Sequence, residues 1–253
     1  MKSLPLILVA AVCAVAVAVA APAALSKPAP ATHVTVAIVD TGVTPSKQLA
    51  GKLVPGWDFI DNDATPTDGY GHGTELASII ASECSACRIM PVRVLGQGGL
   101  GQIPTVIQGI QWAAAHGAKV INVSITTPFS NPDFSAAIEA AVSEGITVTV
   151  AAGNQGATTA YPGTATPDAI VVGSIDSNGQ RFSWSNYGPW VKVVAPGALP
   201  ARSMAGRLVS AVGTSASAAY VAGAAGNLLA CSPTLAPAAV AQRLEASLTS
   251  ASC

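Results

Sequence analysis

The sequence GTSASAAYVAG at residues 213–223 predicts a tight turn that leads directly into a helix of small residues. Ser215 stands at the mouth of this turn, close to the helix N-terminus. Free backbone N–H groups and the positive end of the helix dipole favour negative charge there. The site suits chemistry in which an oxyanion develops, but the same residues could simply cap a helix packed against a sheet.

Three upstream motifs favour the chemical interpretation. VDTG at residues 39–42 ends an apolar run, GHGT at residues 71–74 opens a helical run, and AAGN at residues 151–154 ends another apolar run. A serine nucleophile needs a base, its imidazole needs a partner that fixes the tautomer, and the oxyanion needs preplaced donors. Together with Ser215, the candidates for these roles are His72, Asp40 and Asn154.

Only one of the three histidines has glycine on both sides. Glycines there indicate that the backbone approaches another segment closely. His33 lies at the edge of a linker, and His116 lies next to Gly117 at a predicted helix end, where an imidazole complements the helix dipole. We therefore expect His72 to be the functional histidine.

Apolar runs rich in β-branched residues alternate with helical runs. Because the strands are continuous apolar runs, we expect an α/β fold in three layers, with a mostly parallel β-sheet flanked by helices on both faces. Ligands in such folds bind at the carboxyl ends of the strands, where Asp40 and Asn154 fall. The expected strands are 34–39, 88–95, 120–124, 146–151, 170–174, 191–195 and 208–212, and the expected helices are 74–81, 104–116, 133–144, 214–230 and 237–248.

The composition excludes some classes of partner. The 253 residues suffice for one large domain, charged residues make up 10% of the chain, and the net charge is −1. This balance gives no basic surface for a nucleic acid. We expect a monomer with no nucleic-acid partner.

The N-terminal segment has the features of a secretory signal. Residues 1–20 form a short basic start and an apolar run, with cleavage sites of small residues after Ala20 or Ala23. An uncleaved membrane anchor is the alternative, because residues 4–25 are nearly long enough to span a bilayer. We expect cleavage and export to the periplasm or the medium, without stable membrane association. Residues 21–32 form a Pro/Ala linker, and residues 33–253 form the folded domain.

Four cysteines lie beyond the signal, and an even number in an exported chain favours disulfides. The sequence CSAC at residues 84–87 could instead be a redox motif or half of a zinc site. However, a zinc site needs a second close pair, and a redox motif usually opens a helix. The spacing allows a small loop closed by Cys84 and Cys87, which leaves Cys231 for Cys253, but other pairings stay open.

On these motifs the chain resembles the subtilisin-type serine proteases, or subtilases. The order Asp, His, Ser is the one found in that family. The resemblance runs from about residue 33 to residue 248. The matching stretches are residues 36–42, 68–77, 120–124, 151–154, 161–163 and 213–215.

The resemblance implies an exported serine endopeptidase that acts on polypeptides. Ser215 would be the nucleophile, His72 the general base and then acid, and Asp40 the group that orients His72. Asn154 would donate to the oxyanion together with the Ser215 backbone N–H. Implied substrate-binding residues are Ser124, Ile125 and Thr126 along the substrate backbone, Ala151, Ala152 and Gly153 as a wall of the S1 pocket, and Ala160 near its floor.

No cofactor or metal is expected. Many subtilases carry an insertion in the helix after the catalytic histidine, and its loop helps to bind Ca²⁺. Here that helical run leads directly through residues 84–87 into the next strand, and Glu83 is the only carboxylate nearby.

Departures from the family pattern leave one alternative and bear on specificity. Residues 216–219 are Ala-Ser-Ala-Ala, where subtilases usually have Met and Pro, so a catalytically weak or dead binding protein is the second hypothesis. Thr126 and Thr127 replace glycines, which favours small or medium apolar P1 residues. A lipase of the α/β-hydrolase type is excluded because Ser217 stands at the last glycine of its motif and the order of the triad differs.

Overall fold

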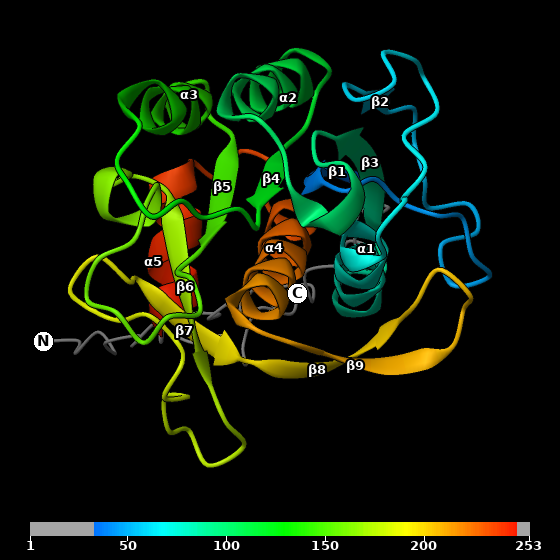
Figure 1. Ribbon diagram of the computed structural model, residues 1–253. Coiled ribbons are helices and arrows are strands. Elements are labelled where there is room, and N and C mark those ends of the chain that lie inside the picture. Colours follow the sequence, from blue (N-terminus) through cyan, green and yellow to red (C-terminus); the bar gives the residue numbers. More distant parts are fainter. Residues whose placement is uncertain (1–32, 247–253) are drawn as a thin grey trace, which may run out of the picture. The chain divides into compact units, whose positions relative to one another are not determined.

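The computed structural model describes residues 33–246, so the predicted signal peptide, the linker and Cys253 lie outside the described residues. A seven-stranded sheet forms its centre, in the order β2-β3-β1-β4-β5-β6-β7, and every neighbouring pair is parallel (Figure 1). The strands are β1 Val34–Asp40, β2 Trp57–Asp58, β3 Cys87–Arg93, β4 Val120–Val123, β5 Thr147–Ala151, β6 Ile170–Ile175 and β7 Val193–Pro196.

Helices cover both faces of this sheet (Figure 1). On one face lie α2 Ile103–Ala115 and α3 Pro132–Ser143, and on the other lie α1 His72–Glu83, α4 Thr214–Cys231 and α5 Pro237–Ala246. Two short 3₁₀ turns, η1 Gln97–Gly99 and η2 Gly163–Ala165, lie in connecting loops. The predicted three-layer α/β fold is confirmed. No helix within residues 33–246 is long and apolar enough to cross a membrane.

The strands are mostly apolar because both faces of the sheet are buried. In β1, Val36 and Ile38 belong to the core formed with α1, α4 and α5. Ala37 and Val39 belong to the core formed with α2 and α3. All four side chains are fully buried, as the alternation of side chains along a covered strand requires.

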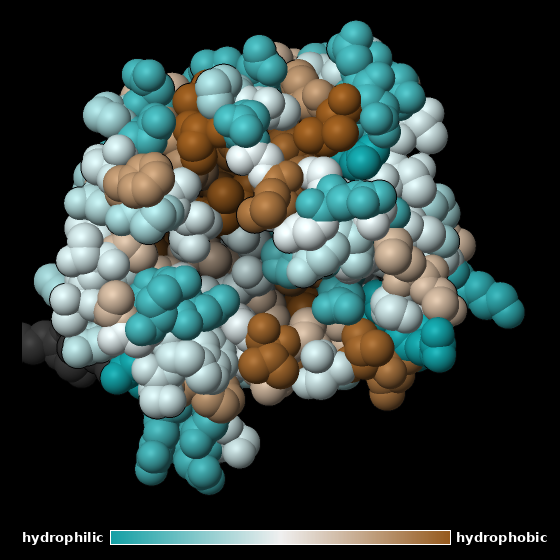
Figure 2. All heavy atoms as spheres, viewed as in Figure 1, coloured by the Kyte–Doolittle hydropathy of each residue, from teal (hydrophilic) through white to brown (hydrophobic). Residues whose placement is uncertain are grey.

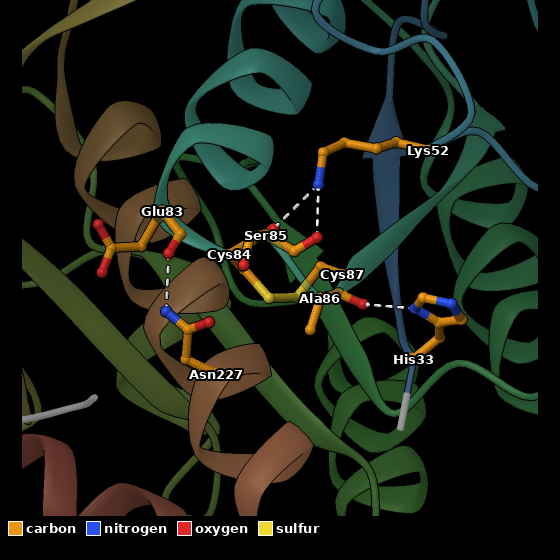
Figure 3. Close-up of a disulfide and its surroundings, with 8 residues drawn as sticks. All are labelled: His33, Lys52, Glu83, Cys84, Ser85, Ala86, Cys87 and Asn227. Carbon is orange, nitrogen blue, oxygen red and sulfur yellow. Dashed lines mark hydrogen bonds between the residues drawn. A yellow bond between two sulfur atoms is a disulfide. The ribbon is translucent and has the colours of Figure 1, made fainter. Parts of the chain in front are cut away.

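Small residues let α4 lie close to the neighbouring elements. A Cβ on Gly223 would lie 2.7 Å from the Glu83 Cβ on α1, and a Cβ on Gly226 would collide with Cys87 Sγ. Cys84 and Cys87 form a disulfide, with their Cα atoms 5.3 Å apart, directly after α1 (Figure 3). This confirms the predicted short loop and places it against α4.

One predicted strand lies outside the main sheet. Residues 208–212 form β9 Leu208–Val212, which pairs antiparallel with β8 Ala198–Arg202, a strand that the sequence did not predict. Pro200 interrupts any strand-like pattern in β8, and proline is tolerated there because the hairpin has free edges. The hairpin runs past α4 toward α1 and returns through Gly213 to the start of α4 (Figure 1).

The strand order places a switch point beside β1. The chain continues from β1 through α1 to β3 on one side, and later through α2 to β4 on the other side. Adjacent connections leave the sheet in opposite directions there, so a crevice opens at the carboxyl ends of β1 and β4. Asp40 ends β1 and Ser124 follows β4, so both border this point.

Candidate active site

Asp40 and His72 form a hydrogen-bonded pair at the switch point. Asp40 is fully buried at the end of β1, and His72 is the first residue of α1. The His72 Nδ1 atom lies 2.8 Å from Asp40 Oδ1 and 2.9 Å from Oδ2. Because a carboxylate only accepts, Nδ1 carries the proton, and Nε2 of the neutral ring is left as the base.

The surroundings of His72 favour its protonated form. Burial of the ring by itself lowers the pKa, but the charge of Asp40 and its hydrogen bond raise it, and Glu75 and Asp68 add to this effect. The net pKa of His72 is raised above its ordinary value. An imidazole of this kind accepts a proton readily and holds it while a neighbouring group reacts.

The glycines beside His72 allow α1 to approach the end of β1. A Cβ on Gly73 would collide with the carbonyl oxygen of Gly42. The Gly73 N–H donates to Thr41 Oγ1 at 2.9 Å, and the Thr41 N–H donates to Asp40 Oδ1 at 2.7 Å. The first turn of α1 is therefore tied directly to the residue after Asp40.

The other two histidines have local partners. His116 stacks on Trp112, and its Nδ1 lies 2.7 Å from the Trp112 carbonyl. His33 contacts the Ala86 carbonyl and the Arg88 guanidinium. Within residues 33–246, His72 is thus the histidine that meets a carboxylate.

Asn154 contacts the turn before Ser215. Asn154 Oδ1 accepts from the Thr214 N–H at 2.9 Å and from Thr214 Oγ1 at 3.0 Å. The backbone N–H identifies the facing atom as oxygen, so Asn154 presents its Nδ2 group elsewhere. Neither this Nδ2 nor the Ser215 N–H has a hydrogen-bond partner in the described part of the chain. Gly213 makes room, because a Cβ there would lie 3.2 Å from Nδ2.

Thr214 joins the turn before Ser215 to the end of β5. Its Oγ1 donates to Asn154 and accepts from the Gly153 N–H at 2.9 Å. The fully buried hydroxyl has partners on both sides, so it fixes the loop after β5 against the N-terminus of α4.

Ser215 keeps its hydroxyl available. Its Oγ makes no hydrogen bond among residues 33–246, while its carbonyl oxygen lies 3.4 Å from Ser124 Oγ. No hydrogen bond joins Ser215 Oγ to His72 in the described part of the chain.

The predicted substrate strand offers free backbone groups. Thr127 pairs with Tyr161 through bonds of 2.7 and 3.4 Å. In contrast, the N–H and C=O groups of Ile125 and Thr126 have no hydrogen-bond partner among the described residues. Free groups of this kind accept an extended chain as an added strand. On the face of the molecule that Figure 2 shows, apolar side chains gather around a hollow on the α2 and α3 side of the sheet.

A cavity of about 310 Å³ lies next to this segment. Of the predicted pocket residues, Thr126 and Ala160 line it, whereas Ala151, Ala152 and Gly153 are buried and do not line it. The lining carries no charged side chain. It also includes Thr127, and residues that the sequence did not single out, namely Pro128, Gln155, Ala157 and Thr159.

Sequence reasoning missed the supporting polar groups. Thr214 and Gln155 flank the named residues Ser215 and Asn154, and that adjacency was the available signal. Gln155 Oε1 accepts from the Asn154 N–H and from Asn186 Nδ2, both at 3.0 Å. Within the described ranges, no group of three or more His, Cys, Asp or Glu side chains could hold a metal ion.

Comparisons with known proteins agree on one family. A family model described as the subtilase family matches residues 31–252. Thermitase of Thermoactinomyces vulgaris is 41% identical over 205 residues, which are 76% of this chain and 74% of that protein. Subtilisin DY of Bacillus licheniformis is 34% identical over 233 residues, with 86% and 84% covered. A solved structure of a cold adapted subtilisin-like serine proteinase aligns with a TM-score of 0.80 at 32% identity, covering 84% of this chain and 81% of that one.

Proposed function

The chain belongs to the subtilase family and is a serine endopeptidase, and on this premise we propose that Ser215, His72, Asp40 and Asn154 carry the reaction. Ser215 Oγ attacks the scissile carbonyl carbon while His72 Nε2 takes its proton. Asp40 holds the resulting imidazolium through Nδ1. The oxyanion accepts from the Ser215 N–H and Asn154 Nδ2.

The later steps use the same groups. His72 gives its proton to the leaving amine, and an acyl-enzyme on Ser215 remains. Water then loses a proton to His72 and attacks the acyl carbon. The bond from that carbon to Ser215 Oγ breaks, His72 returns the proton to Oγ, and the second product leaves. In both tetrahedral intermediates the negative charge lies on the former carbonyl oxygen, at the same two donors.

The Asp40–His72 pair is the observation that carries this proposal. A fully buried carboxylate within 2.9 Å of a ring nitrogen sets the tautomer that a base for serine needs. The raised pKa of His72 supports the role of proton acceptor.

We propose that a polypeptide pairs with residues 124–126 and places its P1 side chain in the 310 Å³ cavity. The free backbone groups of Ile125 and Thr126 support this pairing. The uncharged lining suits apolar P1 residues, and Thr126 at the entrance favours small or medium ones.

Labelling with a fluorophosphonate probe tests the nucleophile. The wild-type protein should react, Ser215→Ala should not, and Ser210→Ala on the exposed part of β9 should react like the wild type. A folded wild-type protein that stays unlabelled would favour the hypothesis of a dead binding protein.

We also propose export, supported by the signal-like residues 1–20 and by the Cys84–Cys87 disulfide. N-terminal sequencing of protein recovered from the periplasm and the medium should find a start at residue 21 or 24. Full-length protein retained in the membrane would support the uncleaved anchor instead.

A further inference from the structure

Helix α1 begins without a side-chain cap of its own. Its N-cap residue is Gly71, with φ at 117°, and no side chain of that residue can satisfy the first N–H groups. These groups need partners, because the N-terminus of a helix leaves several donors unsatisfied. How the N-terminus of α1 is held affects His72, because His72 is the first residue of this helix.

Asp68 supplies those partners from outside the helix. Its Oδ1 accepts from the Tyr70 N–H at 2.8 Å and from the Gly71 N–H at 2.7 Å. Its Oδ2 accepts from the Thr74 N–H at 2.9 Å and from Thr74 Oγ1 at 2.6 Å. The side chain is 5% exposed, so one buried carboxylate accepts four hydrogen bonds around His72.

The same network reaches the segment that follows Asp40. Thr74 Oγ1 donates to Asp68 and accepts from the Thr44 N–H at 3.0 Å. The loop after β1 is therefore tied to the first turn of α1 at Thr44, in addition to the bond from Gly73 to Thr41. A change at Asp68 would loosen the tie between the elements that carry Asp40 and His72.

We propose that Asp68 is a positioning residue of the catalytic centre, which holds the His72 imidazole against Asp40 by anchoring the first turn of α1. This inference rests on the proposed role of His72. Asp68 touches no reacting atom, so it acts through the backbone around His72 and through its negative charge.

The charge of Asp68 has its own consequence for His72. The charged groups that act on the imidazole are Asp40 on β1, Asp68 in the preceding loop and Glu75 on α1 itself. All three are carboxylates, and each favours the protonated ring. Removing one of them should lower the pKa of His72 and move the acid limb of the pH profile to lower pH.

Asp68→Asn is the direct test. The carboxamide has a single oxygen, so its NH₂ group must face an N–H that now lacks an acceptor. We expect kcat for a peptide substrate to fall at least tenfold, KM to change less than twofold, and the acid limb of kcat/KM to move to lower pH. NMR titration of the His72 ring in the Ser215→Ala background should show the same downward shift.

Asp58→Asn is the matched control. Asp58 is also fully buried, accepts two backbone N–H groups and pairs with Arg93, but it does not contact the first turn of α1. A purely structural role would make both variants alike: a lower melting temperature with kcat and the acid limb unchanged. That outcome would overturn the proposal.

Thr74→Val covers the case in which Asp68→Asn does not fold. It removes the hydroxyl that joins Asp68 to Thr44 and retains the charge of Asp68. We expect a several-fold loss of kcat with the acid limb unmoved, and unchanged kcat would count against the proposal. Fluorophosphonate labelling of the wild type separates the two ideas: an unlabelled wild type refutes the proposed function, whereas a labelled one with unaffected variants refutes only the role of Asp68.

Discussion

The Cys84–Cys87 disulfide should stabilise the domain although it closes a loop of only four residues. On the chain-entropy model, a loop of that size contributes about 2 kcal/mol at 25 °C. For a domain of about 200 residues, this corresponds to a fall in melting temperature of about 4 to 8 °C when the bond is removed. Both cysteines are fully buried and Cys87 Sγ lies against Gly226 of α4, so lost packing adds to the effect.

The variant that tests this is Cys84→Ala with Cys87→Ala, made in the Ser215→Ala background to prevent self-digestion. Differential scanning calorimetry of Ser215→Ala with and without the two cysteine replacements gives the shift in melting temperature directly. A fall of less than 2 °C, or a rise, would refute the reasoning.

Lys52 provides the control for the polar contacts of the same turn. Its Nζ donates to the Cys84 carbonyl at 3.3 Å and to the Ser85 carbonyl at 2.8 Å (Figure 3). Because Lys52 is half-buried and its ammonium meets only neutral carbonyl groups, Lys52→Met should cost about 1 kcal/mol or less. A larger effect from Lys52→Met than from the cysteine variant would assign the stabilisation to the ammonium instead.

Five other outcomes are expected. The acid limb of kcat/KM should lie above about pH 6.5, because the reacting His72 must be neutral and its pKa is raised. In the Ser215→Ala variant, the stabilisation from charged His72 should be present below about pH 6.5 and lost as pH rises through the raised pKa, as urea unfolding at several pH values would show. EDTA should leave activity and melting temperature almost unchanged, and a large shift on calcium removal would contradict this. A peptide library should favour small or medium apolar P1 residues, and a profile dominated by Phe and Tyr would show that Thr126 does not restrict the pocket. Mass mapping of unreduced peptides should join Cys231 to Cys253, and any other partner for Cys231 would refute that pairing.

The main elements could be predicted because their sequence patterns are local. Seven strands and five helices fall within two residues of the expected bounds wherever the structure describes them. Strand β9 was predicted, but its hairpin with β8 was not, because Pro200 interrupts the pattern of β8. Its pairing depends on contacts between segments rather than on a pattern within one segment.

The central residues of the site were also predictable. Glycines flank His72, and Asp40 ends an apolar run, so the sequence itself marks a close approach and a strand terminus. Asp68 and Thr214 carry no such mark, since aspartate and threonine are common in any turn. Their roles appear only in the folded chain, where Asp68 meets the first turn of α1 and Thr214 meets Gly153, which is far away in the sequence.

The residues after Ser215 in which the chain departs from the usual subtilase pattern serve packing. Ala216, Ala218 and Ala219 are at most 1% exposed and belong to the core between α4 and the sheet. Ser217 is also buried, and its Oγ lies 2.8 Å from Ser174 Oγ and 2.9 Å from the Pro196 carbonyl. None of these four side chains is in hydrogen-bond contact with His72, Asp40 or Asn154. Changes confined to this buried face alter how α4 packs against the sheet. They leave Asn154, the Ser215 N–H and His72 in place. The altered sequence after Ser215 is therefore no argument for a dead relative.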